Sequence, residues 1–146
     1  MTNLPDPDTQ PQFYDGVAIK RLMAWIVDSV LILLVSVAIL PFTAFTGVFF
    51  FSVLMLVVGF AYRTLTLAGG SATWGMRLFA IEFRTLHAER FDFGTALAHT
   101  LGYSISLAVF PAQAVSIILM LTTSRGQGLT DHVLGTVAMN RRAVVA

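Results

Sequence analysis

Asp28 is the residue of this chain whose position most strongly suggests chemistry. It is the only charged residue in the segment Leu22–Leu40, which is largely apolar and long enough to cross a bilayer. An ionisable group at that depth costs roughly 2.5–3.5 kcal/mol on insertion-derived scales, so it is usually retained for a partner or a function. Such a carboxylate can exchange a proton for an ion, or it can anchor a buried polar network.

Arg21 and Ala24 lie on the same helix face as Asp28. Seven residues advance about 700° around an α-helix and return within roughly 20° of the start. Arg21 and Asp28 are nevertheless about 10.5 Å apart along the axis, too far for a direct salt bridge without a third group. Ala24 leaves room between them for another helix or loop to approach closely. We therefore expect a partner from elsewhere in the chain.

The C-terminal segment 126–136 contains a candidate partner. Asp131 is its only carboxylate and is followed by His132, a residue type that titrates near neutral pH. Asp131 can reach Arg21 only if this segment lies on the same side of the membrane as the start of the first helix. The sequence then predicts one polar network of Arg21, Asp28 and Asp131.

The composition predicts an all-α membrane protein. The 146 residues are 56% hydrophobic and 12% charged with a mean hydropathy of +0.78, whereas soluble domains carry roughly 25% charged residues. Residues 29–62 are uncharged and too long for one crossing at about 1.5 Å per residue, so the chain must turn, and Pro41–Gly47 suits a turn. The predicted parts are a flexible polar tail at 1–16 and a membrane domain at 17–142, with spans at about 17–40, 47–67 and 93–124, a loop at 68–92 and a polar C-terminal motif at 125–142.

The topology of the third hydrophobic segment is open from its residues alone. Pro111 interrupts 93–124, which either crosses once or returns as a helical hairpin with arms Phe93–Phe110 and Ala112–Ser124. The positive-inside rule places the N-terminus and the loop 68–92 in the cytoplasm, because basic residues gather near those span ends. A single crossing would leave the basic C-terminal motif outside. We therefore favour the hairpin, which makes a small bundle of four helices.

The loop 68–92 contains a period-2 pattern. Phe79, Ile81 and Phe83 alternate with Ala80, Glu82 and Arg84, which indicates a strand with one apolar face. We expect a short β-hairpin with residues 91–93 at the membrane surface, or alternatively an interfacial amphipathic helix that begins near Thr73. Asp92 is expected to cap the helix that follows.

Several function classes are disfavoured. A net charge of +1 with scattered basic residues argues against nucleic-acid binding. The chain has no cysteine, and its three histidines are too far apart for a metal site, so we expect no metal and no other cofactor. Glu82 and Glu89 are interpreted as a solvated charged face of the loop. No nucleophile lies near an acid–base pair in the sequence, and we expect the protein not to be an enzyme.

The sequence resembles the RDD family of membrane proteins, named for one arginine and two aspartates. The resemblance extends from about Gly16 to Asn140 and rests on three motifs in order. These are Arg21-x2-Ala24-x3-Asp28, then Thr73-x-Gly75-Met76-Arg77-Leu78, then Gly128-Leu129-x-Asp131-x2-Leu134-Gly135-Thr136. The resemblance makes Arg21, Asp28 and Asp131 the named trio, with the other motif positions and His132 in support. His99 stands where we expect relatives often to have an arginine.

The resemblance implies an integral membrane protein, expected in a bacterial inner (cytoplasmic) membrane, but it leaves two functions open. In the first, the trio is a structural network at the cytoplasmic side of a non-enzymatic accessory subunit, whose partners are the lipid bilayer and either other membrane subunits or further copies of the chain. In the second, an oligomer carries out cation/proton antiport with Asp28 as the carrier and Arg21 tuning it.

Overall fold

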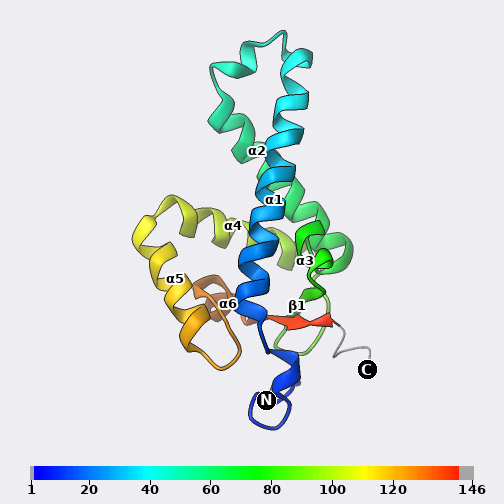
Figure 1. The fold of residues 1–146 in the computed structure, drawn as a ribbon, viewed down its shortest axis with the longest axis vertical. Helices are drawn as coiled ribbons and strands as arrows, with labels where there is room; N and C mark the ends of the chain where they lie inside the picture. Colours follow the sequence, from blue (N-terminus) through cyan, green and yellow to red (C-terminus); the bar gives the residue numbers. More distant parts are fainter. Residues whose placement is uncertain (1, 142–146) are drawn as a thin grey trace.

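The computed structural model describes residues 2–141, which form a mostly helical molecule with a small sheet at one end (Figure 1). The elements in chain order are η1 (Pro11–Phe13), α1 (Val17–Ile39), η2 (Leu40–Thr43), η3 (Thr46–Val48), α2 (Phe51–Gly70), α3 (Trp74–Leu78), β1 (Ile81–Thr85), α4 (Phe93–Ala108), α5 (Phe110–Thr122), α6 (Leu129–Leu134) and β2 (Thr136–Asn140).

The helices α1 and α2 pack as a long antiparallel pair, joined by the turns η2 and η3. Both are apolar enough and long enough to cross a membrane. A helix suits this environment because it satisfies its backbone groups internally, and Ser36 likewise donates its hydroxyl to the Ile32 carbonyl at 2.7 Å. The prediction of two apolar spans before residue 70 is confirmed, with the second span at Phe51–Gly70.

The third hydrophobic segment forms two helices, α4 and α5, between which the chain direction turns by 115°. Asp92 caps α4 as expected, since its carboxylate accepts the Thr95 N–H at 2.7 Å. The break falls at Val109, and Pro111 lies in the first turn of α5, where its missing N–H has no intrahelical partner to lose. In Figure 1 the elbow is level with the lower half of the α1–α2 pair, so α4 and α5 do not reach the end formed by residues 40–50.

The sheet joins two segments that are far apart in sequence. β1 pairs with β2 in antiparallel register, with Ile81 opposite Asn140 and Thr85 opposite Thr136. The predicted strand is present, but the predicted hairpin with residues 91–93 is wrong. Phe91 instead stacks on Phe83 in the core, with ring centroids 5.3 Å apart. All five residues of β2 are buried, and this burial fixes the pairing.

The alternative predicted for the loop, a helix beginning near Thr73, is present beside the strand. Thr73 caps the short helix α3 by accepting the Met76 N–H at 3.2 Å. The loop therefore contains both a strand and a short helix, which the sequence had left as alternatives.

Apolar side chains of the N-terminal segment pack against the sheet, although most residues of this segment are exposed. Leu4 and Tyr14 form an apolar cluster with Val137 and Met139 of β2. The Tyr14 hydroxyl donates to the Pro5 carbonyl at 2.8 Å. The physical reason is that the sheet has two faces, and apolar side chains of the N-terminal segment cover the one that does not face the helices.

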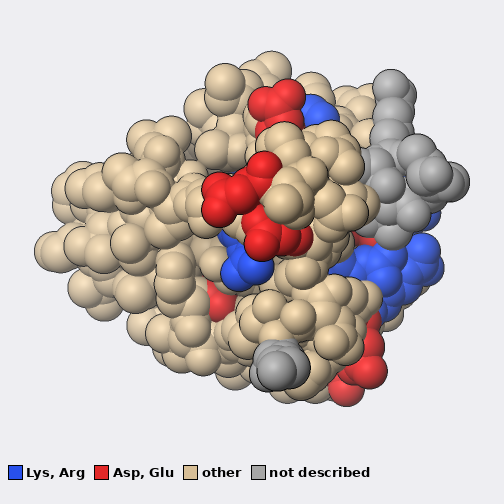
Figure 2. All heavy atoms as spheres, turned by 90° about the horizontal axis from the view of Figure 1, so that it is seen from below, with Lys and Arg blue, Asp and Glu red and all other residues tan. Residues whose placement is uncertain are grey.

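Charged side chains gather at the end that carries the sheet. Figure 2, seen from below, shows basic and acidic residues over this end, whereas the side formed by α4 and α5 is uncharged. The charged residues are therefore concentrated at one end of the molecule, and the helices that extend from it are largely apolar.

We predict that Tyr14→Ala lowers the free energy of unfolding by about 3 kcal/mol, because an aromatic ring leaves a packed cluster. Hydrogen exchange followed by mass spectrometry should then show faster exchange in residues 2–16. Tyr14→Phe is the matched control, since it keeps the ring and loses only one hydrogen bond, about 1 kcal/mol. Unchanged exchange in Tyr14→Ala would show that this segment is not held by the cluster.

Candidate functional site

Asp131 lies at the centre of a buried polar cluster at the foot of α1. Its carboxylate accepts the Arg21 Nη1 at 2.6 Å and the His99 Nε2 at 3.0 Å. It also accepts the Thr136 hydroxyl at 2.7 Å and the Gly128 backbone N–H at 3.0 Å. Four donors thus converge on one carboxylate that has no exposed surface.

The cluster keeps Asp131 ionised. Burial by itself raises the pKa of this carboxyl, but the Arg21 guanidinium and the hydrogen bond from His99 outweigh burial and hold the pKa well below its ordinary value. Arg21 also donates to the Gly126 carbonyl at 3.1 Å, so its guanidinium is fixed from two sides. The result is a buried ion pair between the first helix and α6.

Asp28 accepts donors from two other elements. The Tyr62 hydroxyl of α2 donates to its Oδ1 at 2.6 Å, and the Gly75 N–H of α3 donates to the same oxygen at 2.9 Å. The Thr73 hydroxyl donates to Oδ2 at 2.6 Å. This carboxylate therefore binds the first turn of α3, where backbone N–H groups have no partner within the helix.

The structure places the predicted trio in two clusters. Arg21 and Asp131 are in direct contact, whereas Asp28 shares no hydrogen bond or ion pair with either of them among residues 2–141. The single three-residue network predicted from the sequence is therefore wrong. The helical spacing put Arg21 and Asp28 on one face of α1, but their separation of about 10.5 Å along the axis leaves room for two neighbours, α6 and α3.

Ala24 and Gly75 are small because α1 and α3 touch at this point. Ala24 is buried, and a Cβ at Gly75 would clash with the Ala24 carbonyl oxygen. The same Cβ would come within 2.8 Å of Asp28 Oδ1. A larger side chain at either position would push α3 away from the carboxylate that binds its first turn.

The remaining motif residues shape the ends of helices. Gly135 ends α6 in the left-handed region at a φ of +67°, which favours glycine. His132 donates its Nδ1–H to the Gly128 carbonyl at 2.8 Å and stays outside the Asp131 cluster. Arg77 donates its Nε–H to the Ala72 carbonyl at 3.2 Å, close to the end of α2.

Sequence reasoning missed three residues that matter here. His99 and Tyr62 bind the two aspartates, and the signal for His99 was its departure from the expected arginine. Glu82 is buried, not part of a solvated face, and pairs with Arg84 on the same strand. The alternation of β1 could not indicate this burial, because it places Glu82 on the face opposite Ile81 and Phe83, and the burial of that strand on both faces depends on distant segments.

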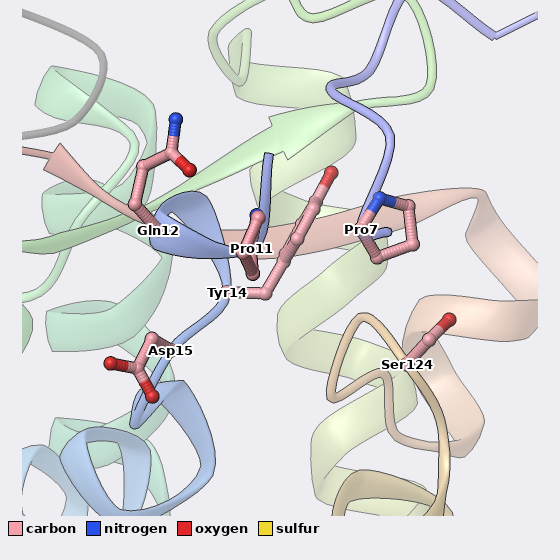
Figure 3. A pocket seen from close by; sticks show the side chains of 6 residues that line it. All are labelled: Pro7, Pro11, Gln12, Tyr14, Asp15 and Ser124. Atoms are coloured by element: carbon pink, nitrogen blue, oxygen red, sulfur yellow. The ribbon is translucent and has the colours of Figure 1, made fainter. Parts of the chain in front are cut away.

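A hollow of about 410 Å³ lies apart from both clusters. Figure 3 shows Ser124, after α5, across from residues of the N-terminal segment; the lining residues are Pro7, Pro11, Gln12, Tyr14, Asp15 and Ser124. None of them binds Asp28 or Asp131. The hollow is therefore lined by none of the residues that bind the two carboxylates.

Long apolar helices whose polar ends are tied together by buried carboxylates define a helical membrane protein. The model of the RDD family, a family of membrane proteins, matches residues 16–135, and the chain belongs to this family. The matched range includes Arg21, Asp28 and Asp131. Comparison with curated proteins and with solved structures found no match.

We predict that Gly75→Ala lowers the free energy of unfolding by about 2 kcal/mol, because the new Cβ forces α3 away from α1. Thermal unfolding in detergent measures the effect. Gly69→Ala is the control, since its Cβ would meet no atom within 4 Å on helix α2, and it should be neutral or slightly stabilising. Equal melting temperatures for the two variants would contradict the close approach.

We predict that Asp131→Asn costs about 3 kcal/mol at pH 7, because Arg21 is left without its counter-ion. The pKa of Asp131 is lowered by folding, so its stabilisation is present above the unfolded pKa of about 3.9 and is lost as the pH falls towards the folded value. Thermal unfolding between pH 7 and pH 3 should therefore show a steeper loss below about pH 4 in the wild type than in the variant.

Asp8→Asn changes an exposed carboxylate of the N-terminal segment and is the control for that experiment. It should follow the wild-type curve. A wild-type curve no steeper than that of Asp131→Asn would show that the ion pair does not govern acid stability.

Proposed function

We propose that this RDD protein is a non-enzymatic structural or accessory subunit of a membrane complex, with its polar end in the cytoplasm of a bacterial inner membrane. The observation that carries the proposal is the complete internal use of both buried aspartates. Asp131 accepts four hydrogen bonds and Asp28 three, all from the chain itself. Carboxylates held in this way suit a scaffold that fixes helices in place.

The apolar helix faces support the proposed membership of a membrane complex. Large hydrophobic side chains are exposed along α1, α2, α4 and α5, including Leu34, Leu56, Ile105 and Leu121. Lipid covers such faces in an isolated chain, and helices of other subunits or further copies of this chain cover them in a complex. The chain thus offers most of its outer surface for lateral contact while its polar groups are satisfied inside.

The orientation rests on charge. Lys20, Arg21 and Arg141 belong to the end that carries the sheet, whereas residues 40–50 at the other end are uncharged. The positive-inside rule favours the sheet end in the cytoplasm.

One observation favours transport as a second candidate. Asp28 has no basic partner among residues 2–141, and its three donors are two hydroxyls and one amide. A buried carboxylate without a counter-ion is the kind of group that an antiporter protonates and deprotonates. Against this role, every donor would have to be released when an ion binds.

Purification of the full chain in mild detergent, after cross-linking in the native membrane, tests the accessory role. We expect a second membrane protein in a fixed ratio with the chain. Because Asp28→Asn puts an amide where α3 needs an acceptor, we also expect a lower melting temperature and loss of that partner. Recovery of this chain alone, from membranes with cross-linking and from membranes without it, would contradict the proposal.

Vesicles that contain only the pure chain separate the two candidates. Dissipation of a pH gradient by Na⁺ or K⁺ in the wild type, with no dissipation in a folded Asp28→Asn variant, would favour transport. Asp8→Asn is the control, and equal leakage from all three proteins and from empty vesicles is the result expected for an accessory subunit.

A further inference from the structure

Arg63 is a charged residue on the spanning helix α2 and has no acidic partner among the residues that the structure describes. Its guanidinium lies over the ring of Tyr103 from α4, 4.3 Å from the ring centroid. Among residues 2–141, no hydrogen bond or ion pair joins this guanidinium to a carboxylate. A charge at the edge of the hydrocarbon region is costly unless it is paired, so a counter-anion from outside the chain is expected.

Arg77 places a second guanidinium on the same face of α2. Its Nη2 lies 3.5 Å from the Thr66 carbonyl oxygen, and a Cβ at Gly70 would come within 2.7 Å of the same nitrogen. Thr66 and Gly70 are three and seven residues after Arg63, so all three share one helix face. Arg77 contacts only neutral carbonyl groups, and no ion pair involves it within residues 2–141.

The surroundings of this face are those of a membrane interface. Trp74 is 57% exposed and Leu78 is 69% exposed on either side of Arg77 in α3. Trp74 also packs edge-on against Tyr62, with ring centroids 5.9 Å apart. The Trp25 indole donates to the Tyr103 hydroxyl at 2.6 Å. Trp and Tyr side chains of this kind gather at the level of lipid headgroups.

No carboxylate within residues 2–141 forms an ion pair with either arginine, and the donors to Asp28 are Tyr62, Thr73 and Gly75. External anions can therefore bind both guanidinium groups. A guanidinium matches a phosphate through two parallel N–H donors, and exposed apolar side chains beside it suit acyl chains.

We propose that Arg63 and Arg77 bind the phosphate groups of anionic phospholipids in the leaflet at the sheet end, with α3 on one side and α4 on the other. The lipids supply the missing counter-ions and lie against the exposed face of α2. This site is separate from both aspartate clusters and does not depend on the proposed accessory role.

Native mass spectrometry of the full chain in detergent tests the proposal with phosphatidylglycerol and phosphatidylcholine added in equal amounts. We expect phosphatidylglycerol to be retained preferentially, and each arginine contributes roughly a fivefold preference. Arg63→Gln with Arg77→Gln should abolish the preference, and Arg63→Lys with Arg77→Lys, which keeps the charge, should retain part of it. Circular dichroism and the melting temperature verify that the variants are folded.

Arg90→Gln is the matched control, because Arg90 is an exposed residue of the loop after β1. It should bind phosphatidylglycerol like the wild type. Inorganic phosphate at millimolar concentration should not displace the lipid, and displacement would assign the site to free phosphate instead. Equal loss of lipid in Arg90→Gln and in the double variant, or no preference in the wild type, would overturn the proposal.

Discussion

The buried ion pair between Arg21 and Asp131 is the constraint on which the rest of the fold depends. Asp131 is fully buried and Arg21 is largely buried, so the protein must bind each charge. Asp131 needs His99 from α4 and Thr136 from β2 in addition to Arg21. The C-terminal segment must therefore return to the foot of α1, and the turn between α4 and α5 is what brings it there.

Asp28, on the same helix, binds the start of α3 by hydrogen bonds. The short helix α3 begins against α1, where its first N–H groups are removed from water and need an acceptor. Asp28 provides the acceptor, and the contact between Ala24 and Gly75 sets the distance. One aspartate thus ties α6 to α1 by charge, and the other ties α3 to α1 by hydrogen bonds to neutral donors. The family motif groups them in sequence, although their partners differ.

The sequence was sufficient for features that depend on local pattern. The apolar runs predicted the helices, Asp92 predicted its cap, and the alternation of Phe79, Ile81 and Phe83 predicted the strand. Features that depend on distant partners were beyond it. β2 is only five residues long, and its pairing with β1 is decided by burial, which a single sequence does not display. The prediction of one network for the trio failed for the same reason. Helical spacing shows which residues share a face of α1, but not which neighbouring element packs against each point along that face.

The position of α4 and α5 decides what remains for other molecules. Their elbow is level with only the lower half of the α1–α2 pair, so in Figure 1 the upper half of the pair has no other helix of the chain beside it. Polar groups there are satisfied within the helices, as Ser36 shows, and what is left is a smooth apolar surface. Lipid tails are as apolar as these side chains, so there is no hydrophobic driving force for helices to associate in the membrane. Association then depends on close packing, often of small residues. The polar end is held together by hydrogen bonds and an ion pair to its two buried carboxylates, whereas the other end presents apolar side chains outward, and this division supports the proposal of a subunit whose lateral contacts are apolar.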